Sequence, residues 1–169
     1  VEVVTCPSSN LKLGSGIAPI YALQNAGVEI AIGTDGAYSN NSYDMFKEMF
    51  LVATLNKGTL NKTDIIKAVD VVDMATKNGA RMLGFEKVGD IVEGNFADII
   101  LIDLNKPHNQ PNNDNISNLV YATKSSDVYL TMINGKIVFE NGRFDIGEEI
   151  GQIYLKNQEI KSKIKVKEI

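Results

Sequence analysis

The sequence contains few of the residues that build disulfides, metal centres and nucleic-acid interfaces. Its 169 residues include one cysteine, one histidine and no tryptophan. The lone Cys6 cannot form an internal disulfide, which fits a reducing compartment. Acidic residues outnumber basic ones and give a net charge of -4. Because a basic surface is the footprint of nucleic-acid binding, we expect no nucleic-acid partner.

Long apolar segments are missing as well. None approaches the ~20 residues that a membrane-spanning helix needs, and no charged start followed by an apolar stretch marks an export signal. The composition, 44% hydrophobic and 22% charged, is typical of a globular domain. We therefore expect a cytoplasmic protein that acts on a small molecule and has no membrane partner.

The chain opens with VEVVTC at residues 1–6, which is predicted to form a strand inside a sheet. An uncovered first strand would present unpaired backbone N–H and C=O groups to water or to other chains. We therefore expect an earlier segment of a longer polypeptide to lie beside it.

Asp35 is the most informative residue of the sequence. It lies in GTDG at residues 33–36, directly after the apolar segment 28–32, which is predicted to form a buried strand. In parallel α/β folds, the carboxyl ends of the strands carry the chemistry. A carboxylate at that edge usually joins histidines on a metal ion, but the chain has only His108. The sequence therefore indicates a metal hydrolase that lacks most of its own active site.

The first half of the chain alternates predicted strands and helices, as expected for a parallel sheet. Segment 7–16 is rich in turn-forming residues and is predicted to be a loop. Strands are predicted over 1–6 and 28–32, and helices over 17–26, 43–57, 63–74 and 76–83.

From residue 87 onward the pattern indicates short β-structure. A short strand with a turn is predicted over 89–98, followed by an apolar strand over 99–102. Asn134-Gly135 predicts a hairpin between strands 128–133 and 136–139. The tail from 148 to 168 is predicted to be a helix with a solvated face of mixed charge.

Five parts of the chain form a recognisable combination: PSSNLKLGSGIAP at 7–19, GTDG at 33–36 with SNN at 39–41, NGARMLG at 78–84, residues 89–98 with Asp103, and residues 128–142. Together they resemble the metal-dependent amidohydrolase superfamily. They are most similar to its 5-methylthioadenosine/S-adenosylhomocysteine deaminase branch, near the chlorohydrolase-type enzymes.

The resemblance implies an α/β fold. The chain would supply the last two strand-helix units of a (β/α)₈ barrel and the C-terminal strands of a small β-sandwich. Residues 1–86 would form the end of the barrel with its following helices, 87–145 the sandwich portion and 146–169 a C-terminal helix. The earlier barrel strands, with the histidine ligands and the proton-donating glutamate of the family, would belong to a missing N-terminal segment.

The resemblance also implies a role for Asp35. It would bind zinc and take the proton of the attacking water in the hydrolytic deamination of an adenosine-type nucleoside. Zinc lowers the pKa of a bound water from ~15.7 to ~7. Stable zinc sites use three or four protein ligands, so we expect the isolated chain to bind zinc poorly and to be inactive. Iron is the second candidate for the metal.

Other functions stay open at this point. The chain can belong to another amidohydrolase, of the chlorohydrolase or guanine deaminase type. It can also be a non-catalytic stable remnant or interaction module, in which Asp35 only accepts hydrogen bonds within its own turn. Homo-oligomer formation is open as well.

The remaining polar residues of interest are predicted to be structural. His108 follows a proline in a polar loop and is expected at the surface. Cys6 is interpreted as a small buried strand residue without a base to activate it. Asp44 and Glu48 are expected to cap a helix or to face solvent. The family often has histidine where this chain has Thr5, which leaves no role to assign there.

Overall fold

The structure is a computed structural model, and it describes residues 1–164. These residues form a mixed α/β fold with two separate sheets. In chain order the elements are β1 (Glu2–Thr5), α1 (Pro7–Lys12), α2 (Ile20–Asn25), β2 (Glu29–Ile32), α3 (Ala37–Asn40), α4 (Met45–Leu60), α5 (Ala68–Ala75), α6 (Lys77–Met82), β3 (Ile99–Ile102), η1 (Pro107–Asn109), α7 (Asn115–Tyr121), η2 (Ser125–Asp127), β4 (Val128–Ile133), β5 (Lys136–Glu140), β6 (Arg143–Phe144) and α8 (Ile150–Lys163).

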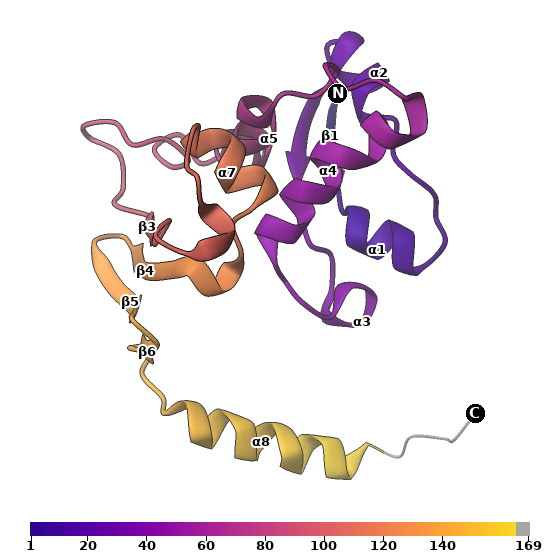
Figure 1. Cartoon of the computed structure of the whole chain (residues 1–169). Helices are drawn as coiled ribbons and strands as arrows, with labels where there is room; N and C mark the ends of the chain where they lie inside the picture. Colours follow the sequence, from indigo (N-terminus) through magenta and orange to yellow (C-terminus); the bar gives the residue numbers. More distant parts are fainter. Residues whose placement is uncertain (165–169) are drawn as a thin grey trace.

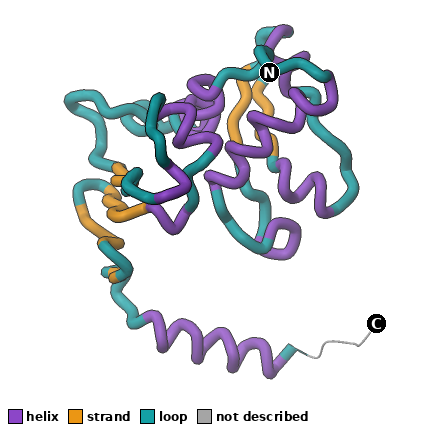
Figure 2. Tube along the Cα trace, in the orientation of Figure 1, coloured by secondary structure: helices purple, strands orange, loops and turns teal. Residues whose placement is uncertain are grey.

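Strands β1 and β2 form a parallel pair within the helical body of the molecule (Figure 2). Glu2 lies opposite Glu29 and Thr5 lies opposite Ile32, so both strands end at the same edge. The connection between them contains α1 and α2, as a parallel crossover requires. This confirms the two strands predicted at the end of a barrel, whereas a closed barrel is not seen within residues 1–164.

The hydrophobic core lies between β2 and helices α4, α5 and α7. Its best-buried members include Ile30, Val52, Val71 and Val120, each no more than 2% exposed. Asp44 caps the N-terminus of helix α4, and its carboxylate accepts hydrogen bonds from the N–H groups of Phe46 and Lys47. Such a cap satisfies backbone donors that the first helical turn leaves free. Figure 1 shows α4 crossing in front of the β1–β2 pair.

The second sheet is antiparallel, in the order β3-β4-β5-β6. The predicted hairpin is confirmed, because β4 pairs with β5 across a turn in which Asn134 has φ 48° and Gly135 has φ 78°. Two consecutive positive φ values are what a two-residue hairpin turn of type I′ requires. These strands form one sheet, and a second sheet that would complete a sandwich is not among residues 1–164.

Three local predictions were wrong. Of the predicted loop 7–16, residues 7–12 form the helix α1 and only 13–16 are non-helical; Pro7 stands at the first helical position, where a missing N–H costs nothing. The helix predicted from residue 63 begins only at Ala68. Segment 89–98 forms turns without a strand.

The C-terminal helix is confirmed over Ile150–Lys163, and residues 165–168 of that prediction lie outside the described part. No residue of α8 is buried, and the helix extends from the end of the second sheet, apart from the helical body (Figure 1). No helix within residues 1–164 is both long and apolar enough to cross a bilayer.

Candidate functional site

Asp35 lies at the edge where the two parallel strands end. The backbone N–H of Gly33, between β2 and Asp35, donates to the carbonyl of Thr5 at 2.9 Å and extends the strand pairing by one bond. A Cβ atom at Gly33 would lie 3.1 Å from Val4 Cγ1 and 3.2 Å from Cys6 Sγ. The glycine therefore allows the two strand ends to approach closely. This geometry places Asp35 beside the segment that follows β1.

Three donors surround the Asp35 carboxylate. The hydroxyls of Ser9 and Ser39 lie 2.6 Å and 2.7 Å from its Oδ2 atom, and the N–H of Gly36 lies 2.7 Å from Oδ1. Ser9 belongs to α1 and Ser39 to α3. Asp35 itself is exposed and has φ 60°, a left-handed conformation that aspartate tolerates better than most residues.

These donors favour the ionised form of Asp35. The hydroxyl of Ser9, then that of Ser39 and the N–H of Gly36, hold the pKa of the Asp35 carboxyl below its usual value. The carboxylate has about four acceptor positions. Two hydrogen bonds end on Oδ2 and one ends on Oδ1. Asp35 is therefore a charged group with acceptor capacity left on Oδ1.

Glu48 departs from its sequence prediction. It was expected to cap a helix or face solvent, but it is 0% exposed on α4. Its Oε2 accepts from the backbone N–H of Ser8 at 3.0 Å, and its Oε1 accepts from Asn40 Nδ2 at 2.8 Å. The cause is tertiary: α4 packs against α1 and turns this position away from solvent. Asp44, in contrast, caps α4 as predicted.

Cys6 follows β1 and is partly buried. Burial, together with the negative charges of Asp35 and Glu48, raises the pKa of its thiol. A neutral thiol is a poor nucleophile. The prediction of a buried strand residue was wrong in its location, because Cys6 lies just after the end of β1 and is only half-buried.

Lys12 links α1 to the segment after Asp35. Its ammonium donates to the carbonyl of Tyr38 at 2.7 Å and to the side chain of Asn41. The serine, asparagine and lysine contacts around Asp35 were not predicted. That these residues lie near Asp35 could have been predicted, since segments 7–16 and 33–41 each follow one strand of a parallel pair.

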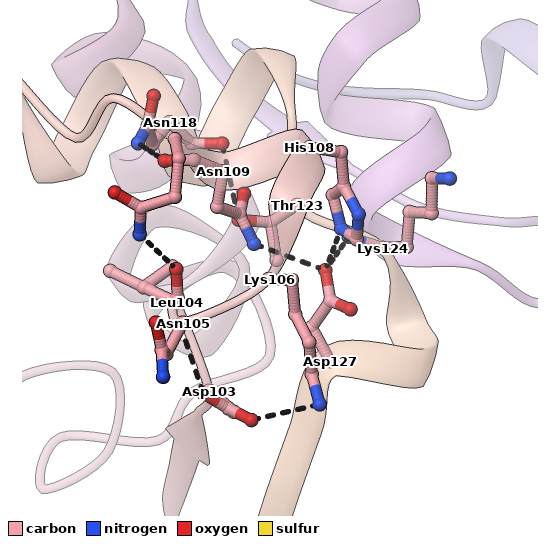
Figure 3. A network of polar contacts seen from close by, with 11 residues as sticks. Asp103, Leu104, Asn105, Lys106, His108, Asn109, Asn118, Thr123, Lys124 and Asp127 are labelled. Carbon is pink, nitrogen blue, oxygen red and sulfur yellow. Dashed lines mark hydrogen bonds and ion pairs between the residues drawn. The ribbon is translucent and has the colours of Figure 1, made fainter.

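His108 lies in a different polar cluster, in the second half of the chain (Figure 3). Its Nε2 atom is 2.7 Å from Oδ2 of Asp127, whose side chain is only 3% exposed. The N–H of Lys124 donates to the same oxygen at 2.9 Å. His108 is thus at the surface as predicted, but it bonds a buried partner.

The contacts of this cluster are structural, because they join separate segments of the second half of the chain. The N–H of Asp103 donates to the carbonyl of Asp127 at 2.8 Å, and Asn118 donates to the carbonyl of Asn109 at 2.9 Å. These bonds join the loop after β3 to α7 and to the residue before β4. Within residues 1–164, no three histidine, cysteine, aspartate or glutamate side chains are grouped closely enough to hold a metal ion.

Comparison with known proteins points to one family. The model of the Amidohydrolase family matches residues 1–138. A 5-methylthioadenosine/S-adenosylhomocysteine deaminase from Dictyoglomus thermophilum is 49% identical over 140 residues, which are 83% of this chain and 33% of that protein. The protein of the same name from Moorella thermoacetica is 49% identical over 143 residues, 84% of this chain and 33% of its own length. The chain therefore spans about a third of the length of these curated relatives.

Two solved structures extend the similarity. An adenosine deaminase from Xanthomonas campestris with bound zinc matches with a TM-score of 0.91 and 38% identity, over 96% of this chain and 37% of that one. An atrazine chlorohydrolase from Arthrobacter aurescens, complexed with zinc, matches with a TM-score of 0.86 and 25% identity, over 95% of this chain and 36% of that one.

Proposed function

The chain belongs to the Amidohydrolase family, and we propose that it forms the C-terminal third of a zinc-dependent deaminase of adenosine-type nucleosides. The substrates we propose are 5-methylthioadenosine and S-adenosylhomocysteine, the compounds that name its relatives at 49% identity. The proposed active protein needs an upstream barrel segment, and we place it in the cytoplasm.

The observation that carries this proposal is the position and charge of Asp35. It stands at the carboxyl edge of a parallel strand pair, where barrel enzymes place catalytic groups. It is held in the ionised form by Ser9, Ser39 and the N–H of Gly36. A carboxylate oxygen is an ordinary zinc ligand.

The residues of this chain fit a zinc site in part. Asp35 would supply one ligand oxygen, and the partners needed for a closed set of three or four would come from the upstream segment. Bound zinc would supply Lewis-acid activation of water and polarisation of the substrate. Asp35, as an ionised carboxylate, would accept a proton during water attack. Ser9 and Ser39 would orient it for that task.

A second candidate, the non-catalytic module, rests on one specific observation. The N–H of Gly36 donates to Asp35 within its own turn, as that alternative also predicts, and Ser39 donates from the helix α3 that follows directly. Metal binding and turnover separate the two.

The experiment compares this chain alone with a chimera. In the chimera, the chain replaces the last third of the Moorella thermoacetica relative, joined before Val1. Both are dialysed, their zinc content is measured, and ammonia release from 5-methylthioadenosine and S-adenosylhomocysteine is assayed. We expect about one zinc per chimera and turnover, and neither with the chain alone.

The variant Asp35→Asn in the chimera tests the assigned residue. We expect it to keep the fold, to lose most of the zinc, and to lower kcat by at least ~10²-fold, the smaller end of what a positioned proton acceptor contributes. Asp44→Asn, which retains a capping oxygen outside the site, is the matched control. A folded chimera without zinc or turnover would support the non-catalytic alternative.

A further inference from the structure

Glu48 is a buried carboxylate without a cationic partner. Its side chain is 0% exposed, and within residues 1–164 no lysine, arginine or histidine forms an ion pair with it. Burying an ionisable group is costly unless hydrogen bonds compensate for the lost water. The buried Glu48 side chain therefore depends on the hydrogen bonds that its two oxygens accept.

Those contacts join two segments that are distant in sequence. Glu48 Oε2 accepts from the N–H of Ser8 at 3.0 Å, in the first turn of α1. Glu48 Oε1 accepts from Asn40 Nδ2 at 2.8 Å, at the end of α3. Asn40 Nδ2 also donates to the carbonyl of Thr34 at 2.8 Å, in the turn that carries Asp35. Glu48 thus bonds both α1 and α3, the helices whose serines donate to Asp35.

Each residue that Glu48 holds is adjacent to a donor of Asp35. Ser8 precedes Ser9, and Asn40 follows Ser39. The hydroxyls of Ser9 and Ser39 both donate to Oδ2 of Asp35. From this arrangement we infer that Glu48 is a positioning residue, which sets the two seryl hydroxyls against Asp35 through Ser8 and Asn40. Its importance for turnover rests on the proposed function.

The carboxylate is the group that suits this task. Both of its partners, the Ser8 N–H and the Asn40 amide, are donors, so the side chain at position 48 must offer two acceptor oxygens. A glutamine of the same size would turn its NH₂ group toward one of them. Glu48→Gln therefore breaks one contact without creating a cavity.

The test measures the titration of Asp35 in the full 169-residue chain, by NMR of its ¹³C-labelled side-chain carboxyl. Ser9→Ala removes one donor directly and defines an upward shift of the titration midpoint. We expect Glu48→Gln to shift the midpoint in the same direction. In the Ser9→Ala/Ser39→Ala background, where neither hydroxyl is left to position, we expect Glu48→Gln to add no shift. Such non-additivity is the signature of residues that act together.

Asp44→Ala is the matched control, because it weakens the cap of the same helix without touching Glu48. We expect it to lower thermal stability and to leave the Asp35 midpoint unchanged. If Glu48→Gln does not fold, Asn40→Ala decides, since it removes the bonds to Glu48 and to Thr34 and leaves the Glu48 side chain in place. An unchanged midpoint in a folded Glu48→Gln or Asn40→Ala chain overturns the inference.

The chimera adds a functional readout. There we expect Glu48→Gln to weaken zinc binding or turnover by about 10- to 100-fold, as groups that orient a metal ligand typically do. The titration needs neither zinc nor activity. An inactive chimera with an intact Glu48 effect on Asp35 would count against the proposed function alone, and activity without that effect would count against the inference alone.

Discussion

The hydroxyl of Ser9 lies 2.6 Å from Oδ2 of Asp35, although the two residues are 26 positions apart in the chain. The contact exists because the parallel strands β1 and β2 end at the same edge, so the residues that follow each strand meet. It is the first cause of the lowered pKa of Asp35.

Ser9→Ala tests the energetic side of this contact. Because the pKa of Asp35 is lower in the folded chain than in the unfolded one, its contribution to stability is present above the ordinary value of about 3.9 and is lost as the pH falls through the lower folded value. The stability difference between wild type and Ser9→Ala should be largest above about pH 4 and shrink below it. Urea unfolding at several pH values measures this, with the exposed Ser15→Ala as control. A pH-independent difference would contradict the prediction.

His108→Ala tests the polar cluster of the second half. The substitution removes the contact of His108 Nε2 with the buried Asp127 carboxylate. That contact is a hydrogen bond from a neutral ring, or an ion pair if the ring is protonated. Since the His108 side chain is 33% exposed, we expect a loss of about 1–2 kcal/mol of unfolding free energy. Lys106→Ala, which removes the exposed ion pair with Asp103, should cost about 0–1 kcal/mol. Equal losses would show that burial of Asp127 does not strengthen its contact.

Gly89→Ala tests a close approach of two segments. A Cβ atom at Gly89 would lie 2.6 Å from the Cα atom of Lys77, at a φ of 101°. Gly94 has φ 90° but open space around its Cα. Both alanine variants bear the cost of a positive φ, about 1–2 kcal/mol. Only Gly89→Ala should add a steric cost of about 1–3 kcal/mol. Thermal unfolding of the two variants measures the difference, which should vanish if the loop moves freely away from α6.

Ile30→Ala tests the core beneath the candidate site. Ile30 is 2% exposed on β2, whereas Ile100 on β3 is 48% exposed. We expect Ile30→Ala to cost about 2–5 kcal/mol, because it removes buried carbon and leaves a cavity. Ile100→Ala should change stability by about 0.5 kcal/mol or less. Chemical denaturation of both variants decides whether β2 belongs to the cooperative core.

Local signals in the sequence predicted the elements that depend on local interactions. The hairpin at Asn134-Gly135 is one example, since the required left-handed conformations are a property of those two residues. The strand before Asp35 is another, because its apolar residues 30–32 are buried as the pattern predicts. The position of Asp35 at the end of this strand followed from the apolar segment and from the GTDG sequence directly after it.

The rest depended on contacts that no local pattern contains. Glu48 bonds Ser8, which is 40 residues away, and the amphipathic pattern of α4 gives no sign that a glutamate faces inward. The start of α5 was misplaced because Thr63 and Asp64 look like a helix cap, while the chain stays non-helical up to Lys67. The strand predicted over 89–98 failed because Gly89 packs on the backbone of Lys77 and the segment forms turns.

Helix α8 has 14 residues and none of them is buried. Its own backbone hydrogen bonds and an exposed ion pair between Lys156 and Glu148 stabilise it, without the support of a packed core. A helix of that length in water is only marginally stable. On heating, the chain should therefore lose part of its far-ultraviolet dichroism gradually, before the sharp step in which the packed body melts. Truncation after Gly147 should remove that sloping baseline and leave the midpoint of the step in place.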